Sequence, residues 1–315
     1  MSEATNQPKD AEEAASTKEN PRMQNLKLTQ ASMDPLKVKM SHWQKKLVIP
    51  GTPWDICGYS RSAYRTGFYI AALDMLLDAG PQHFGNPTHI LITHTHIDHC
   101  ACLPFTLIGD ESHQPHIYAV AKAGPRILQY VSGMFSVNAM EDCDASPFYT
   151  FHGLEPHSQF QLTTKKTDLE IQVFECDHPI PTISYGFAEK KHKLKSEYLK
   201  LPGKEIGKLR KEGVEITQEV VQKKFAYVCD TSIDVFALNP SILAYPVVFI
   251  ECTFLWDDEL ENAIQTKHVH WSQLKPIVEQ HPGIVFVAFH FSQRYRDDEI
   301  EEFFAKENMP NVIWW

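Results

Sequence analysis

The chain has 315 residues, of which 43% are hydrophobic and 22% are charged, and its formal net charge is −10. This length and composition favour one large α/β domain with a substantial core, and they exclude a wholly disordered chain. No apolar run reaches the roughly 18–20 residues that span a bilayer, and the negative net charge argues against nucleic-acid binding by the surface as a whole.

The N-terminal segment MSEATNQPKDAEEAASTKEN is polar and contains several acidic residues. It lacks the apolar stretch of a secretion signal, and its acidity is unlike that of a transit peptide. We predict a disordered polar tail over residues 1–35 and one folded domain over residues 36–315. Seven cysteines without a CxxC pair indicate reduced thiols, and therefore a cytoplasmic location, or a nuclear one if the source is a eukaryote.

Short apolar runs in the first half of the chain predict its strands. Two strands at residues 66–70 and 75–77 lead to the turn Asp78-Ala79-Gly80, and a third, THILITH, ends at His94. A fourth strand, HIYAVA, precedes the helical segment GPRILQYVSGMFSV.

Further apolar or alternating runs in the second half also lead to polar residues. LEIQVFECDH ends at His178, KFAYVCDTS leads to Asp230, PVVFIECTFL contains Glu251, and GIVFVAFHFS leads to His290. Enzymes built from α/β layers gather polar side chains where buried strands end. We therefore expect His94 to meet the polar residues of these later runs.

The segment THTHIDHC, residues 93–100, follows a buried strand and concentrates three histidines and an aspartate. Its spacing does not fit one face of a helix, whereas a tight loop would bring all four side chains to one point. Imidazole and carboxylate groups at one point are typical of a divalent-metal site. Cys100 and Cys102 flank this cluster and are alternative ligands.

Four ligands from one loop are too many for one tetrahedral zinc ion, so we expect two ions. His94 and His96 would bind the first, which His178 can complete. Asp98 and His99 would bind the second, which His290 can complete. The carboxylate of Asp230 can bridge both ions and leave a position for a hydroxide between them.

Residues 189–213, EKKHKLKSEYLKLPGKEIGKLRKEG, differ from the rest of this acidic chain because they are rich in lysine. One interpretation is a solvated pair of surface helices with i,i+4 ion pairs. The other is a basic lobe that neutralises phosphate groups.

The HTHIDH segment matches the HxHxDH signature of the metallo-β-lactamase superfamily, which the chain resembles from roughly Gly51 to His290. The later residues His178, Asp230 and His290 follow in the order that this superfamily uses. The resemblance implies an αββα sandwich of two facing mixed β-sheets flanked by helices, with a dinuclear metal site at one edge.

Within that superfamily the chain resembles tRNase Z (ribonuclease Z), in its short form. HFSQRY at 290–295 is similar to the HFSxRY block of that family, and YVCDTS is similar to its GDT block, with Cys229 in place of glycine. IECTFL resembles the HEATF block, and KHVHWSQL resembles a block that supplies a histidine near the metals. LPGKEIGKLRKEG resembles the base of the tRNA-gripping arm, although the Gly-Pro dipeptide of that arm is absent.

The resemblance implies a metal-dependent phosphodiester hydrolase that removes the 3′ trailer from precursor tRNA. Two divalent ions, zinc or alternatively manganese, would hold a hydroxide that attacks the phosphorus. Asp98 would hold or deprotonate the water, and His268 would protonate the leaving 3′-oxygen while Glu251 orients its ring. His270 is the alternative acid.

Two other functions stay open at this point. One is a hydrolase of the same fold that acts on a small lactone, thioester or cyclic phosphodiester, which the acidic net charge favours. The other is an RNA-binding scaffold without turnover. The expected partner is precursor tRNA and not a membrane, and a homodimer is left open.

Overall fold

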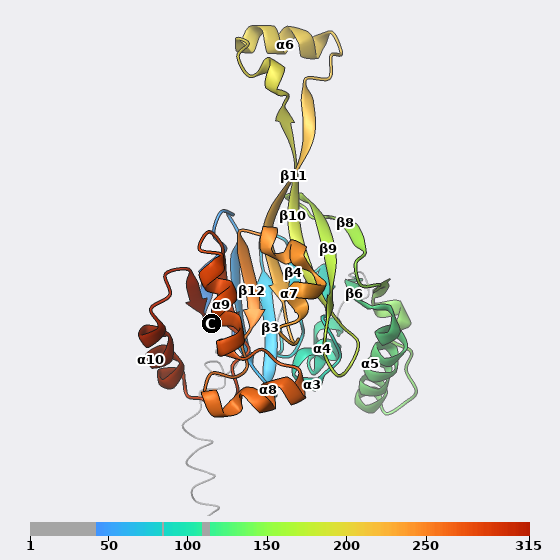
Figure 1. Ribbon diagram of the computed structural model, residues 1–315. Helices are drawn as coiled ribbons and strands as arrows, with labels where there is room; N and C mark the ends of the chain where they lie inside the picture. Colours follow the sequence, from blue (N-terminus) through green and yellow to red (C-terminus); the bar gives the residue numbers. More distant parts are fainter. Residues whose placement is uncertain (1–41, 84, 109–113) are drawn as a thin grey trace, which may run out of the picture. The chain divides into compact units, whose positions relative to one another are not determined.

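Two seven-stranded β-sheets face each other in the computed structural model, with helices outside them (Figure 1). The structure describes residues 42–83, 85–108 and 114–315. The predicted tail at residues 1–35 and the domain boundary at residue 36 lie outside these ranges. The predicted αββα sandwich is confirmed.

The first sheet has the strand order β1-β2-β3-β4-β5-β6-β7. Strands β1 to β4 pair antiparallel, and β4 to β7 pair parallel. The strands are β1 Lys46–Val48, β2 Asp55–Arg61, β3 Arg65–Ile70, β4 Met75–Leu77, β5 His89–Leu91, β6 His116–Val120 and β7 Thr150–Leu154.

The second sheet has the order β14-β13-β12-β11-β10-β9-β8, in which β11 to β14 are parallel and β8 to β11 pair antiparallel. Because β9 and β11 both pair antiparallel with β10, β9 runs in the same direction as β11. The strands are β8 Gln159–Thr163, β9 Asp168–Cys176, β10 Thr182–Leu194, β11 Thr217–Val228, β12 Val247–Glu251, β13 Val285–Phe289 and β14 Val312–Trp314.

Aromatic side chains join the two sheets in the core. The ring of Phe68 on β3 lies 5.8 Å from that of Tyr227 on β11 and 5.4 Å from that of Phe289 on β13. Trp315 packs 5.0 Å from Phe68, and its indole nitrogen donates to the backbone oxygen of Gly58. Edge-to-face aromatic packing of this kind adds to the stabilisation that burial supplies.

Helices cover the outer faces of the sheets. On the first sheet, α5 buries Ile127, Val131 and Phe135, which recur every four residues along one face. On the second sheet, a separate apolar cluster joins α9 and α10 to the strands. The helices are α3 Ile97–Cys100, α4 Leu103–Leu107, α5 Gly124–Ala139, α6 Gly203–Lys211, α7 Val235–Leu238, α8 Leu260–Thr266, α9 Trp271–Gln280 and α10 Asp297–Glu307.

The lysine-rich segment is not a pair of helices. Its first six residues continue β10, and beyond Lys190 this strand pairs only with β11, as a two-stranded ribbon (Figure 1). An ion pair between Lys190 and Glu219, with 3.0 Å between nitrogen and oxygen, links the two strands of the ribbon. A short 3₁₀ turn, Ser196–Tyr198, and α6 follow. The helix-pair interpretation is therefore wrong, because pairing with β11 extends the β-ladder into this segment.

No helix among the described residues is long and apolar enough to cross a membrane.

Candidate metal centre

Five strands, one from the first sheet and four from the second, lead to residues that meet at one edge of the sandwich. In the first sheet β5 leads to His94, and in the second sheet the residues that follow β9, β11 and β13 include His178, Asp230 and His290. Glu251 is the last residue of β12. In the second sheet β11, β12 and β13 pair parallel and β9 runs in their direction, so their carboxyl ends lie at the same edge, as the sequence predicts.

Four ligand atoms form a first group: nitrogens of His94, His96 and His178 and an oxygen of Asp230 lie within 4.8 Å of one another. Nε2 of His94 lies 3.0 Å from Nδ1 of His96. Nε2 of His178 lies 3.2 Å from the same Nδ1. Oδ2 of Asp230 is 3.6 Å from Nε2 of His94. Three ring nitrogens that converge on one point suit a shared cation better than hydrogen bonds with each other.

A second group lies beside the first and contains Asp98, His99 and His290. Nε2 of His99 is 3.3 Å from Nε2 of His290, and Oδ2 of Asp98 is 3.5 Å from the former. Oδ1 of Asp230 lies 3.3 Å from each of those two nitrogens. The two oxygens of Asp230 thus face different groups, which is the arrangement that a bridging carboxylate requires.

The short helix α3 carries Asp98 and His99, and His96 is its N-cap residue. Close packing against Gly80 sets the position of this helix, because a Cβ atom at Gly80 would lie only 1.8 Å from the backbone oxygen of Asp98. The backbone N–H of Ala63, in the turn between β2 and β3, donates to Oδ2 of Asp98 at 2.9 Å. These contacts hold the HTHIDH loop against the first sheet.

Asp78 contacts the centre through His99. It is not among the site residues predicted from the sequence. Its Oδ2 lies 3.1 Å from Nδ1 of His99 and accepts a hydrogen bond from the hydroxyl of Tyr227. Its Oδ1 accepts the backbone N–H of Thr93, which lies between the end of β5 and His94. A carboxylate on the far ring nitrogen orients a metal-binding imidazole. Asp78 also follows a buried strand, so the strand-end pattern could have identified it.

Charge balance also fits the binding of cations. The four buried carboxylates Asp78, Asp98, Asp230 and Glu251 have no lysine or arginine partner among the described residues. Burial alone would raise the pKa of Asp98 and Asp230, but interactions with the surrounding histidines hold both pKa values well below their usual range. Four buried carboxylates without a lysine or arginine partner in the described part of the chain favour bound divalent ions.

The pKa of several histidines suits a role as ligands. Burial lowers the pKa of His94, His96 and His178, so these rings are neutral near pH 7. A neutral imidazole is the form that binds a metal. The residues present therefore fit a divalent-metal site.

His268 lies at the rim of this centre and contacts Glu251. Its Nδ1 is 2.8 Å from Oε1 of Glu251, and its ring stacks on that of His290 with 5.7 Å between centroids. A ligand atom of His268 lies within 4.8 Å of Asp230. Burial lowers the pKa of His268, but the charge of Glu251 outweighs this and raises that pKa to about 9. The ring can therefore carry a proton toward the centre on its other nitrogen.

His270, the alternative acid, has both ring nitrogens engaged elsewhere. Its Nδ1 accepts the backbone N–H of Ser272 and so caps α9, and its Nε2 lies 2.8 Å from the backbone oxygen of Trp256. The side chain is fully buried. This geometry favours a structural role for His270 and leaves His268 as the candidate acid.

Cys100 and Cys102 are separate from both ligand groups, whereas the sulfur of Cys229 lies within 4.8 Å of ligand atoms of Asp78 and His99. The thiol of Cys100 lies 3.5 Å from the backbone oxygen of Thr95, and neither Cys100 nor Cys102 belongs to a metal-binding group among the described residues. Cys229 lies closer, with its sulfur 3.2 Å from Oδ1 of Asp230, but burial raises its thiol pKa strongly. A protonated thiol is a poor ligand.

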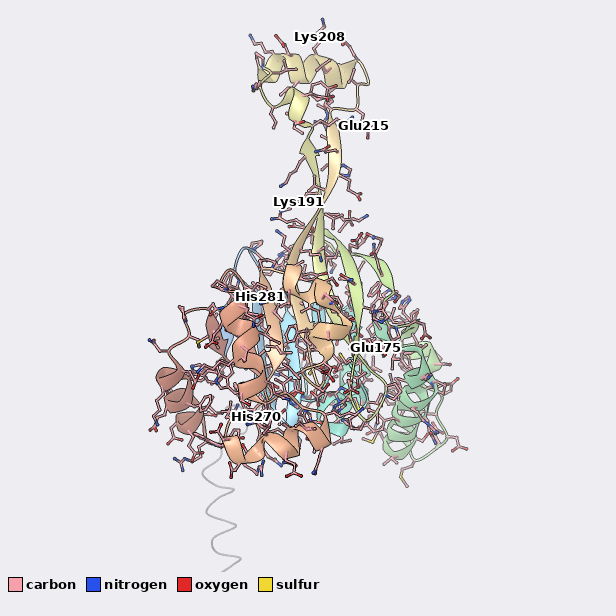
Figure 2. All side chains as sticks on the ribbon, in the orientation of Figure 1. Glu175, Lys191, Lys208, Glu215, His270 and His281 are labelled. Carbon is pink, nitrogen blue, oxygen red and sulfur yellow. The ribbon has the colours of Figure 1, made fainter. Side chains whose placement is uncertain are left out.

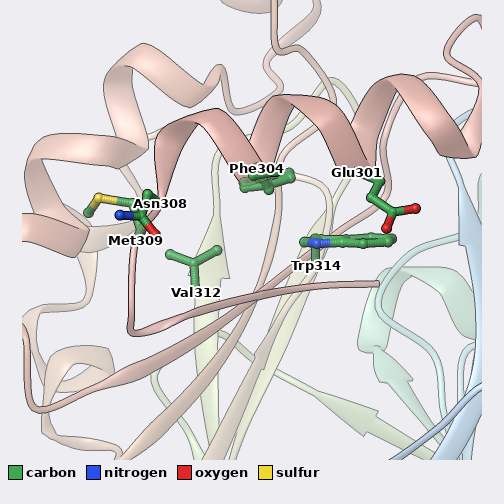
Figure 3. Close-up of a pocket in the computed structure, with 7 residues that line it drawn as sticks. Glu301, Phe304, Asn308, Met309, Val312 and Trp314 are labelled. Carbon is green, nitrogen blue, oxygen red and sulfur yellow. The ribbon is translucent and has the colours of Figure 1, made fainter.

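A cavity of about 280 Å³ between α10 and β14 lies apart from this chemistry. It is lined by Phe304, Val312, Trp314 and their neighbours (Figure 3). None of its lining residues belongs to either ligand group. It is therefore not the site that the sequence predicts.

The ribbon of β10 and β11, together with the segment that contains α6, forms an arm that carries positive charge. Residues 189–222, which include the returning strand, contain nine lysine or arginine residues and six glutamates, a net charge of +3 in a chain of net charge −10. Lys191 lies on the ribbon and Lys208 on α6 (Figure 2). Among the described residues, six of these cations have no ion-pair partner: Lys193, Lys195, Lys200, Lys204, Arg210 and Lys211.

Comparison with known proteins gives relatives of one family. The chain is 30% identical over 266 residues to tRNase Z TRZ1 of Arabidopsis thaliana, covering 82% of this chain and 92% of that protein. No family model matches the chain.

Solved structures share its fold. The short form of human tRNase Z (ELAC1) is similar with a TM-score of 0.51 at 16% identity, covering 82% of this chain and 94% of that one. The metallo-β-lactamase fold protein YhfI of Bacillus subtilis is similar with a TM-score of 0.52 at 13% identity, covering 81% and 92%. With the extent of the match to the plant relative, these findings show that the chain belongs to the tRNase Z (ribonuclease Z) family of hydrolytic endoribonucleases, which has the metallo-β-lactamase fold.

Proposed function

We propose that this chain removes the 3′ trailer from precursor tRNA by hydrolysing one phosphodiester bond. The observation that carries the proposal is the path of β10 and β11. β10 begins near the metal centre and runs into the positively charged arm, and β11 returns from the arm and leads to Asp230. One pair of strands thus connects a phosphate-binding surface to a hydrolytic centre.

The ligand assignment follows the two groups of side chains. His94, His96, His178 and Asp230 would hold one divalent ion. The second would be held by Asp98, His99 and His290, again with Asp230. When bound, the two ions supply Lewis acidity for the phosphate and lower the pKa of water. Imidazole nitrogen with carboxylate oxygen suits zinc and, as the alternative, manganese.

Three side chains would handle protons. Asp98 lies at the centre with its Oδ2 oriented by the N–H of Ala63, so it can hold or accept a proton of the attacking water. His268 would donate a proton from Nε2 to the 3′-oxygen that leaves on the tRNA side. Glu251 would keep Nδ1 of His268 engaged and so leave Nε2 as the donor.

The arm would bind the body of the tRNA through phosphate contacts, which position the substrate without reading its sequence. A reducing compartment, the cytoplasm or the nucleus, suits this chain, because all seven cysteines are free.

The test is cleavage of a 3′-extended precursor tRNA by the metal-loaded protein. We expect one cut 3′ of the discriminator nucleotide, giving a tRNA with a 3′-hydroxyl and a trailer with a 5′-phosphate. The Asp230→Asn variant should not cut. A protein that leaves this RNA intact but hydrolyses a lactone, thioester or cyclic phosphodiester would overturn the proposal, as would binding of the RNA without turnover.

A further inference from the structure

A second cavity, of about 200 Å³, lies beside the metal centre. None of its lining residues belongs to the two ligand groups. Thr95 and Ile97 line it from the HTHIDH loop, and Arg126 and Tyr130 line it from α5. Thr95 stands between His94 and His96 in the chain. The pocket therefore adjoins the first ligand group through the backbone itself.

The walls of the pocket suit a flat apolar group. Leu103 and Ile127, which line it, are buried, whereas the side chain of Ile97, another lining residue, is 63% exposed. The hydroxyl of Tyr130 donates to the backbone oxygen of Ala101 at 2.7 Å, which holds the ring in place. The volume is below the range of sites for drug-sized molecules, so it suits one ring system.

Positive charge borders the pocket on α5. Arg126 is exposed, donates only to the side chain of Gln129, and has no ion-pair partner among the described residues. An apolar slot with a free guanidinium at its side has the chemistry that binds a nucleobase and its phosphate.

We infer that this pocket receives one nucleobase of the RNA adjacent to the scissile phosphate, while Arg126 binds the phosphate next to it. The inference rests on the proposed function and deepens it by assigning a nucleotide subsite. A base held there would fix the register of the RNA on the metal centre and so contribute to the choice of the bond that is cut.

The test combines a change in the RNA with a change in the pocket. Two precursors each carry a single abasic nucleotide, immediately 5′ or immediately 3′ of the scissile phosphate, and kcat/KM is compared with that of the unmodified precursor. For the wild-type protein we expect kcat/KM to fall by at least about fivefold when one of the two positions is abasic, which is the size of a stacking contact. The other position should change little.

The pocket variants are Arg126→Gln and Ile97→Ala, with Lys122→Gln as the matched control. Lys122 is an exposed cation just before α5 that does not line the pocket. In both pocket variants the unmodified precursor should lose activity and the penalty for the abasic site should shrink toward onefold. In the control the full penalty should remain.

Other outcomes would overturn the inference. Equal abasic penalties in wild-type and pocket variants mean that the base binds elsewhere, and no penalty at either position means that no base is bound. A wild-type dimer in sedimentation that both pocket variants dissociate would show a protein interface instead. If the wild-type protein fails to cut even the unmodified precursor, the proposed function itself fails, which is a distinguishable result.

Discussion

Oε1 of Glu251 lies 2.8 Å from Nδ1 of His268, although the two residues belong to different parts of the second sheet layer. The carboxylate is itself held by the backbone N–H groups of Thr231 and Thr253. Because Glu251 engages Nδ1 of His268, Nε2 is the nitrogen that faces the centre. The proposed transfer of a proton from Nε2 can therefore be tested by replacing either residue.

Replacing His268 should impair reactions according to their leaving group. An alkoxide gains much from protonation, so His268→Ala should slow RNA cleavage by about 10²–10⁴-fold. Hydrolysis of bis(p-nitrophenyl) phosphate should fall far less, because nitrophenolate leaves without a proton. Glu251→Gln should give a weaker form of the same pattern. Equal losses on both substrates would contradict an acid role for His268.

Replacing His270 should affect stability rather than proton transfer. His270→Ala removes the side-chain cap of α9 and the contact with Trp256, and the loss of a helix cap costs about 0.5–2 kcal/mol. Urea unfolding should show this loss, and the remaining folded protein should hydrolyse RNA and nitrophenyl ester in the wild-type ratio. If the ratio falls and that of His268→Ala does not, the assignment of the acid is reversed.

Replacing Asp230 should remove metal without unfolding the chain. Asp230→Ala takes away a carboxylate whose two oxygens face different ligand groups. Metal content by mass spectrometry should therefore fall below that of the wild-type protein, and hydrolysis should be lost. Asp177→Asn is the matched control, because Asp177 lies near the end of β9 but pairs with Lys267. A wild-type protein that holds one ion or none after metal loading would contradict the dinuclear assignment.

Reversing charge on the arm should weaken RNA binding and not the chemistry. Replacing Lys204, Lys208 and Arg210 with Glu should reduce affinity for precursor tRNA and lower the slope of log affinity against log salt by about 0.7–0.9 per lost phosphate contact. Cleavage of bis(p-nitrophenyl) phosphate should barely change.

The same charge change outside the arm gives the control for this experiment. Lys165, Lys166 and Lys306 are exposed, and their replacement with Glu should weaken RNA binding much less. If the arm variant loses both substrates equally, the arm has a structural role.

The metal-free protein should lose stability as the pH rises through the range in which the His268 side chain loses its proton. The folded-state pKa of about 9 lies above the ordinary value of 6.5, because Glu251 outweighs burial. The stability from this proton is therefore fully present below pH 6.5 and is lost as the pH rises through 9. Urea unfolding of the metal-free wild type should show this decline, and His268→Gln should show much less of it. Parallel profiles would contradict the pKa assignment.

The sequence predicted which polar residues meet at the strand ends because the relevant physics is local. A buried strand leads the polar residues that follow it to the sheet edge, and His178, Asp230 and His290 each lie one or two positions beyond the end of a buried strand. The HTHIDH loop is also local, and its residues meet the others as expected. That these residues bind metal stays a prediction, since what the structure describes is their convergence.

Other features depend on contacts that no short stretch of sequence contains. The role of Asp78 requires the fold to place it behind His99. The two histidines of KHVHWSQL look equivalent in the sequence, and only packing separates the one that contacts Glu251 from the one that caps α9. The first residues of the lysine-rich segment form a strand only because they pair with β11. This partner is distant in the sequence, so the local pattern alone suggested a helix.

The continuous strands β10 and β11 fix the distance between the arm and the metal centre. β11 has twelve residues from Thr217 to Val228 and reaches Asp230 two positions later, and at about 3.3 Å per residue such a strand spans about 40 Å. A paired ribbon resists compression in a way that a loop does not. If the arm binds the RNA body as proposed, the number of residues in these strands would set the distance between that contact and the bond that is cut.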